Sequence, residues 1–215
     1  RDYFNVYAVT AVSKHNIFGT GYETALGCEL AGGNSTGISG EDNAVQRYVQ
    51  CVDNIDMSET LAVVILNSPA YAGTTYFGYT NQTKVVEFAI AYCPVIYDLQ
   101  SESFRQVLVH EAVGHGFAKL EDEYAYQENG TISSKEIKNV QYLQTLGWAQ
   151  NVDFTSDPSQ VLWSAFLNDN RYVSEKLGVF EGACTYIKGA YRPSEESMMN
   201  SNTEGFRSEE RRVGK

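Results

Sequence analysis

Val107-Leu-Val-His-Glu-Ala-Val-Gly-His-Gly-Phe-Ala-Lys-Leu-Glu-Asp-Glu-Tyr124 is the stretch around which the rest of the sequence is interpreted. It holds two of the three histidines of the chain, His110 and His115, with Glu111 directly after the first. An acidic cluster, Glu121 to Glu123, follows them. Neutral imidazoles, a carboxylate ligand and a second carboxylate that acts on water are what a catalytic zinc site requires. The stretch therefore predicts a metal site.

The spacing of the two histidines departs from the familiar H-E-x-x-H pattern, because they are five residues apart instead of four. In a regular α-helix, at about 100° per residue, their rings would diverge by about 140° and could not share one ion. A π-bulge would absorb the extra residue, and Gly114 would ease the change in the backbone. The alternative is an ordinary helix that carries two unrelated histidines. Spacing alone leaves both interpretations open.

The run from His110 to Tyr124 resembles the active-site signature of the IgA-peptidase family of zinc metallopeptidases, which are metzincin-like proteases. Residues 1–9, 152–158 and 191–200 resemble the same family, so the similarity covers residue 1 to about residue 206. The resemblance implies an α/β (α+β) fold of the zincin type. Such a domain has a mixed twisted sheet with an antiparallel edge strand, an active-site helix, and an irregular C-terminal lobe with a methionine-containing turn.

The apolar pattern predicts strands and helices along the chain. Strands are expected over residues 3–12, 23–30, 61–66, 70–79 and 85–92. Helices are expected over residues 41–55, after an N-cap at Ser101, and over 134–146 and 158–167, while residues 178–189 form a strand or a loop. The run Leu61–Leu66 is typical of a strand that is buried on both faces. Residues 70–79 suit an edge strand, which the resemblance places along the active-site cleft, paired with an extended substrate.

One domain of residues 1–206 is expected, with a sheet-and-helix lobe (1–118) and a C-terminal lobe (119–206). Residues 207–215 match what a common short-read sequencing adapter encodes when it is read in frame, so we leave them out of the fold prediction. The alternative is a genuine charged tail.

The roles of the site residues follow from the pattern together with the resemblance. His110 and His115 are the first two expected zinc ligands, and His15, with Lys14 and Asn16 beside it, has the surroundings of an exposed loop residue. The resemblance implies Asp122 as the third ligand, with Glu123 as the second choice.

Two further roles come from the same comparison. Glu111 is expected to be the general base that takes a proton from water. Met199 is expected to form an apolar floor beneath the ligand rings, as the methionine turn of metzincins does. Those proteins usually have glycine three residues after the second histidine, where this chain has Ala118.

The composition excludes some partners. The net charge is −11 and the sequence pI about 4.7, which argues against nucleic acid, because phosphate backbones require lysine and arginine. No apolar run is long enough to span a membrane. The four cysteines are widely spaced and could form two disulfides or remain buried thiols. No feature of the sequence indicates an oligomeric state.

The sequence thus predicts a zinc endopeptidase that hydrolyses an extended protein or peptide substrate. The family name suggests immunoglobulin A, and relatives look like exported proteins of gut bacteria, either secreted, periplasmic or at the cell surface. The alternative is a non-catalytic secreted binding or scaffold module, or an inactive fragment, with the same fold.

Overall fold

The computed structural model describes residues 4–16, 22–30 and 37–213. The chain is a mixed α+β protein that divides into two compact units, Arg1–Ala112 and Val113–Lys215. Each unit has its own buried core.

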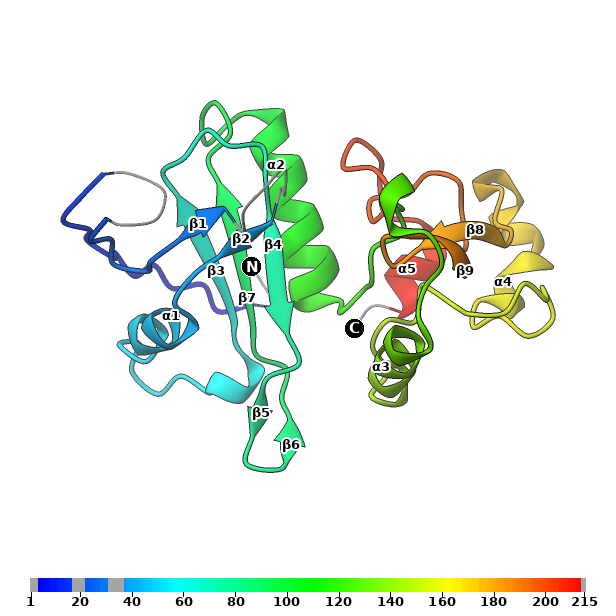
Figure 1. The fold of residues 1–215 in the computed structure, drawn as a ribbon, viewed down its shortest axis with the longest axis horizontal. Helices are drawn as coiled ribbons and strands as arrows, with labels where there is room; N and C mark the ends of the chain where they lie inside the picture. The colour runs from blue at the N-terminus through cyan, green and yellow to red at the C-terminus, as the bar shows by residue number, and fades with distance from the viewer. Residues whose placement is uncertain (1–3, 17–21, 31–36, 214–215) are drawn as a thin grey trace. The chain divides into compact units, whose positions relative to one another are not determined.

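A three-stranded mixed sheet forms the centre of the N-terminal unit (Figure 1). Its strand order is β3 (Leu61–Leu66), β7 (Ala89–Pro94) and β4 (Thr74–Phe77). β3 runs parallel to β7, and β4 runs antiparallel to it, so the expected antiparallel edge strand is present. Every side chain of the central strand β7 is buried, as its continuous apolar sequence favours.

The two faces of the sheet are covered by different helices (Figure 1). Ile90 and Tyr92 of β7 pack in a cluster that includes Val45 of α1 (Asp42–Val49). Ala91 and Cys93, which alternate with them, pack in a second cluster with α2 (Glu102–Leu108). Ser101 begins α2, as predicted, because its hydroxyl accepts a hydrogen bond from the main-chain N–H of Phe104 at 3.1 Å.

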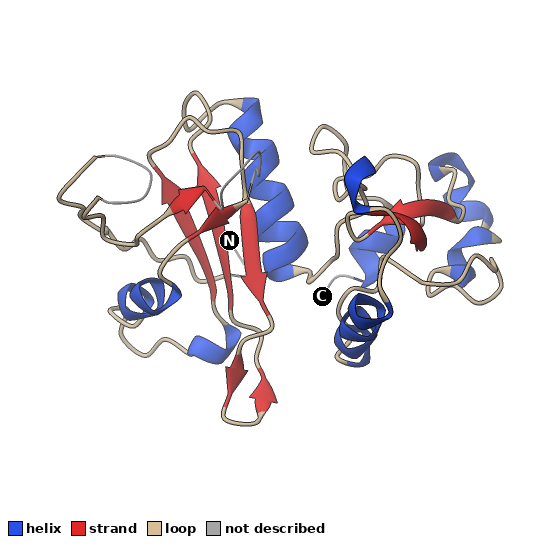
Figure 2. Cartoon of the chain, viewed as in Figure 1, coloured by secondary structure: helices blue, strands red, loops and turns tan. Residues whose placement is uncertain are grey.

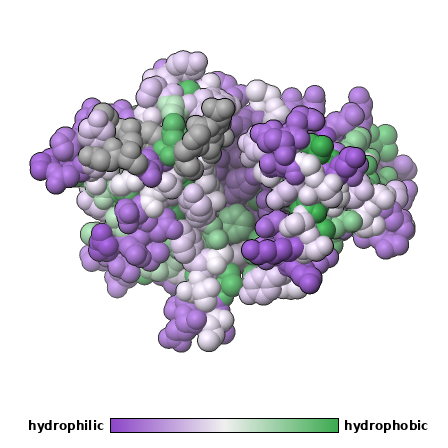
Figure 3. All heavy atoms as spheres, in the orientation of Figure 1, coloured by the Kyte–Doolittle hydropathy of each residue, from purple (hydrophilic) through white to green (hydrophobic). Residues whose placement is uncertain are grey.

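Short elements complete this unit. They are β1 (Glu29–Leu30) paired with β2 (Ile38–Ser39), β5 (Thr80–Asn81) paired with β6 (Lys84–Val85), and a 3-10 helix over Met57–Glu59. The hairpin of β5 and β6 carries mostly exposed, hydrophilic side chains, which are visible at the bottom of Figure 3.

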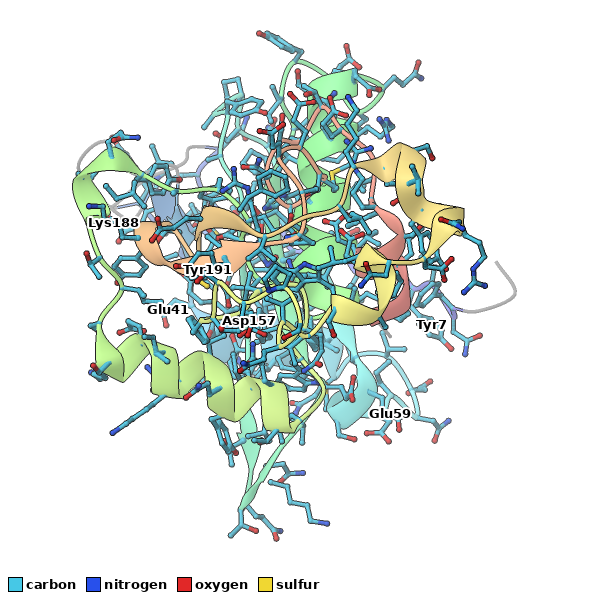
Figure 4. The ribbon with its side chains drawn as sticks, turned by 90° about the vertical axis from the view of Figure 1, so that its right-hand side faces the viewer. Tyr7, Glu41, Glu59, Asp157, Lys188 and Tyr191 are labelled. Carbon is cyan, nitrogen blue, oxygen red and sulfur yellow. The ribbon has the colours of Figure 1, made fainter. Side chains whose placement is uncertain are left out.

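Loops and short helices make up most of the C-terminal unit (Figure 2). Its elements are α3 (Ser134–Thr145), α4 (Ser164–Leu167), β8 (Phe180–Ala183), β9 (Tyr186–Arg192), α5 (Ser208–Val213) and 3-10 helices over Gln127–Asn129 and Asn170–Glu175. β8 and β9 pair antiparallel, and their buried side chains join α3 in one apolar cluster. Figure 4 marks Lys188 and Tyr191 on β9, and Asp157 in the loop that leads to α4.

Two strand predictions are wrong. Residues 4–12 contain no strand, and Tyr3 lies outside the described residues. Alternation makes a strand only where a second strand pairs with it. Residues 4–12 form no strand within the described part of the chain, and Val6 is 86% exposed. β3 has the predicted bounds but is not buried on both faces. It is the other edge of the sheet, and Val63 and Ile65 are 39% and 47% exposed.

Several elements are shorter than predicted. In place of the strand over 23–30 only β1 forms, α1 ends at Val49, and α4 occupies the last part of the helix expected over 158–167. The strand expected over 85–92 is displaced to β7, which extends through Pro94. β2 follows residues 31–36, which lie outside the described residues.

The structure gives the state of the cysteines and the conformation of the end of the chain, but the origin of residues 207–215 stays a prediction. All four cysteines are free thiols, three of them buried and Cys51 exposed. The suspected tail forms α5, with Glu209 and Glu210 buried, and neither carboxylate oxygen of Glu209 has a hydrogen-bond partner among the described residues. Within the described segments, the longest apolar helix falls short of what a membrane crossing needs.

Candidate metal centre

A π-helix carries both histidines of the predicted site. It spans Val109–Phe117 and continues directly from α2. A π-helix pairs each residue with the one five positions on, so it brings side chains at this spacing onto one side of the helix. The expected accommodation of the extra residue is therefore present, and it extends through nine residues instead of a single bulge.

The π-helix and the turn after it bring three potential ligands together. Ligand atoms of His110, His115 and Asp122 all lie within 4.8 Å of one another. Both histidines are buried and Asp122 is half-buried. This group, which lies within residues 110–122, could hold a metal ion. Two imidazole nitrogens and one carboxylate oxygen form a donor set that suits zinc.

The ring of His115 is oriented by a main-chain carbonyl. Its Nδ1 lies 2.7 Å from the oxygen of Leu120, which can only accept, so Nδ1 carries the hydrogen. Its Nε2 lies 3.1 Å from Oδ1 of Asp122. In a neutral ring this nitrogen holds a lone pair, so two acceptors face each other. The arrangement fits a shared cation, which is either a second ring proton or a metal ion.

Glu111 is held on the sheet side of the helix by the edge strand. The hydroxyl of Thr75 in β4 lies 2.8 Å from its Oε2 and 2.9 Å from its main-chain oxygen. Gly73 leaves room for the other oxygen, since a Cβ there would lie 2.6 Å from Oε1. Glu111 is buried and directly follows His110 in the sequence. It is not one of the three residues of the metal-compatible group.

The turn after His115 differs from the expected form. The residue with a left-handed backbone is Lys119, with a φ of 56°, and not Ala118. Lys119 is buried, its ammonium group donates to the carbonyl of Gly116, and it lies 5.6 Å from the centre of the Trp148 ring. These contacts hold a non-glycine residue in a conformation that usually favours glycine.

The three acidic residues after the turn have different surroundings. Asp122 belongs to the metal-compatible group, whereas both oxygens of Glu123 accept hydrogen bonds, from Asn151 at 2.9 Å and from Ser197 at 2.7 Å. Burial, with the charge of Asp122 beside it, raises the pKa of Glu121 to about 7. Glu123, the second choice for the third ligand, lies outside the metal-compatible group.

Tyr124 directly follows this cluster. Burial first, and then the neighbouring Asp122 carboxylate, raise the pKa of its hydroxyl above the usual value. The hydroxyl therefore stays protonated and can donate to Asp122, with which it forms a hydrogen bond.

Met199 packs beneath the π-helix within the C-terminal unit. Its side chain is fully buried, and a Cβ at Gly114 would overlap the Met199 sulfur. The packing of Met199 thus requires glycine at position 114, in addition to any help that glycine gives to the backbone of the π-helix.

Several residues of this site have no signature in the sequence. Thr75 and Gly73 lie in the predicted edge strand, but nothing in the strand pattern indicates that they face Glu111. The sequence around Asn151 likewise gives no sign of its role, although Asn151 forms hydrogen bonds with Glu121 and Glu123, which are 30 and 28 residues away. Ser197 belongs to the stretch that resembles the family, which is the one available signal.

The mixed α+β fold and the group of two histidines and an aspartate define a protein with a candidate metal site. The chain belongs to the IgA peptidase M64 family, whose model matches residues 1–174. It is therefore a member of a peptidase family, and the peptidases of this family are metallo-enzymes. The matched residues include the whole metal-compatible group but end before Met199. Among curated proteins, none matches the chain.

Proposed function

We propose that the chain is a zinc-dependent endopeptidase, with His110, His115 and Asp122 as the zinc ligands. The observation that carries the proposal is the convergence of their ligand atoms within 4.8 Å, in a chain of a peptidase family. The orientation of His115 by the Leu120 carbonyl supports it, because metal-binding imidazoles usually donate their other N–H to such a partner.

Zinc, when bound, would lower the pKa of a coordinated water and polarise the scissile carbonyl. Glu111 would take a proton from the attacking water and deliver it to the leaving amine. Its burial and its hydrogen bond from Thr75 would hold the carboxylate in one orientation. Met199 would support the ligand helix from below, as an apolar floor.

The edge strand β4 is the proposed substrate-binding element. It pairs with β7 on one side, and an extended peptide could add to its other side through main-chain hydrogen bonds. Thr75 would then connect the strand that binds substrate to the residue that moves the proton. The family description suggests immunoglobulin A as a substrate, and an exported bacterial protein, at the cell surface, in the periplasm or secreted, would meet it.

Zinc content and turnover test this proposal together. The purified chain, stripped with a chelator and reconstituted, should bind about one equivalent of zinc and cleave members of a peptide library. Glu111→Gln is the matched variant: it should retain zinc while the turnover rate falls by about 10²–10⁴-fold. His115→Ala should lose the zinc itself.

The contrary outcomes are distinct. A chain that binds no zinc at micromolar concentration would rule out the metallopeptidase. A chain that binds zinc but cleaves neither the library nor immunoglobulin A would favour the non-catalytic binding module. Cleavage of the library without cleavage of immunoglobulin A would retain the enzyme and reject that substrate.

A further inference from the structure

Asn151 holds the main chain on one side of the proposed third ligand. Its Oδ1 accepts from the N–H of Glu121 at 2.9 Å, which fixes the orientation of the amide. Its Nδ2 therefore carries the two donors, and these reach the oxygen of Glu121 at 2.8 Å and Oε1 of Glu123 at 2.9 Å. Asn151 is fully buried, and each of these contacts is with the segment that contains Asp122.

Glu123 holds the other side of the same ligand. Its Oε2 accepts from the hydroxyl of Ser197 at 2.7 Å, and its main-chain N–H donates to the oxygen of Met199 at 2.9 Å. Its side chain is fully buried. Glu123 therefore joins the segment of Asp122 to the turn that carries Met199.

Asp122 lies between these two restrained residues. Its own carbonyl accepts from the N–H of Cys184 at 2.8 Å, so the main chain is anchored at three consecutive residues. With the backbone fixed, the carboxylate can move only about its own side-chain bonds, and its Oδ1 lies 3.1 Å from Nε2 of His115.

We infer that Asn151, Glu123 and Ser197 form a positioning network, which presents Asp122 to the metal that the proposed function places beside it. This inference rests on that function and concerns residues outside the group of three proposed ligands. Partners behind the ligands typically set metal affinity by holding each ligand in one orientation, and their loss lowers affinity about 10–100-fold.

The polarity of the network supports a role beyond packing. Burying a carboxylate and an amide is unfavourable, and apolar side chains of similar volume could fill the same space at equal or better stability. Apolar side chains, however, could not fix the direction of the main chain at Glu121 and Glu123. Hydrogen bonds depend on orientation, whereas apolar contacts do not.

Zinc affinity of the full chain tests the network without requiring a substrate. The dissociation constant would be measured by competition with a chromophoric chelator, and the geometry of the site by the absorption spectrum of the Co²⁺-loaded protein. Glu123→Ala and Asn151→Ala should weaken zinc binding about 10–100-fold and alter the Co²⁺ spectrum. Ser197→Ala, which removes one hydrogen bond and little volume, should have a smaller effect in the same direction.

Two variants separate the hydrogen bonds from other effects. Glu123→Gln can still accept from Asn151 and can donate to Ser197, whose hydroxyl can rotate, so it should bind zinc within about threefold of the unaltered chain. Asn139→Ala is the matched control, because Asn139 also donates to a glutamate, Glu136, at 3.4 Å, but at an exposed position of α3. It should bind zinc as the unaltered chain does.

The inference would be overturned by zinc affinities of Asn151→Ala and Ser197→Ala equal to that of the unaltered chain, whatever their thermal stability. It would also fail if Glu123→Gln lost as much affinity as Glu123→Ala, since charge and not hydrogen bonding would then be responsible. If Glu123→Ala does not fold, Ser197→Ala and Asn151→Ala still decide the question. Failure of the proposed function looks different: the unaltered chain itself would bind no zinc.

Discussion

The hydroxyl of Thr75 lies 2.8 Å from Oε2 of Glu111, and so joins the edge strand of the sheet to the carboxylate beside His110. The two residues are 36 positions apart in the sequence. A hydrogen bond to an ionised group contributes about 1.5–3 kcal/mol, enough to hold a side chain in one rotamer. The structure therefore gives the proposed general base a fixed orientation before any substrate is bound.

Replacing Thr75 by valine keeps the shape of the side chain but removes this donor. We expect the kcat on a library-derived peptide to fall about tenfold or more, in line with the loss of one such hydrogen bond. The zinc dissociation constant should not change, because Thr75 lies outside the ligand group. Thr75→Ser should retain most of the rate, and Thr80→Val, at an exposed position of β5, should retain all of it. A wild-type rate for Thr75→Val would remove Thr75 from the mechanism.

Gly73→Ala tests the space around the same carboxylate. Its Cβ would lie 2.6 Å from Oε1 of Glu111 and 2.9 Å from Cγ1 of Val107, so the carboxylate has to move. We expect kcat to fall by more than in Thr75→Val, with zinc still bound. Gly205→Ala, where a Cβ would meet nothing within 4 Å, is the control for the substitution itself. Equal rates for the two alanine variants would contradict the expected clash between the new Cβ at position 73 and the Glu111 carboxylate.

Gly114→Ala tests the packing of Met199 against the π-helix. The new Cβ would overlap the Met199 sulfur in a fully buried position. Overpacking of this kind lowers the free energy of unfolding by about 1–3 kcal/mol, which for a chain of this size lowers the Tm by about 2–4 °C per kcal/mol. Thermal unfolding followed by circular dichroism measures the effect. If the new Cβ and the Met199 side chain compete for this space, the double variant Gly114→Ala/Met199→Ala should lose less stability than the sum of the losses of the two single variants. Losses that simply add would argue against the contact.

Glu209 makes the stability of the metal-free protein fall as the pH rises from acidic to weakly basic values. Burial, together with the charge of Glu210, raises its pKa from 4.5 to about 8. The folded state therefore binds more protons than the unfolded state between these values, and the stability falls as the pH rises from about 4.5 to about 8. Each unit of pKa difference corresponds to about 1.4 kcal/mol.

Urea unfolding at pH 5 and pH 8.5 measures this linkage. Glu209→Gln should match the unaltered chain at pH 5 and be more stable at pH 8.5, because glutamine has no charge to bury. Glu128→Gln, at an exposed position, should shift neither value. The same difference at both pH values would mean that ionisation of Glu209 is not the cause.

The histidine stretch allowed much of the site to be predicted, because its information is local. A spacing of five residues, with both histidines facing one metal, is consistent only with a helix that has absorbed a residue, and the π-helix has done so. Asp122 lies only seven residues after His115, so a single turn brings it back. Their roles as ligands stay a prediction until metal is bound and measured.

The residues around the site could not be predicted, because their partners are distant in sequence. Thr75, Asn151 and Ser197 reach their partners across 36, 28 and 74 positions, and no short pattern encodes such contacts. The first predicted strand was wrong for a related reason. Alternation at residues 4–12 describes a preference of the local chain, whereas a strand also needs a neighbour.

The long π-helix has a consequence for how metal-binding sequences are recognised. Val113, 42% exposed, is one residue of the extra-long interval, and a chain without it would place the histidines at the usual four-residue separation. A rule written for the α-helical interval overlooks a chain whose histidines are five residues apart on a π-helix. In this chain the candidate ligand atoms lie within 4.8 Å of one another despite the longer interval, so a search by distance in space would find a group that a search by residue count misses.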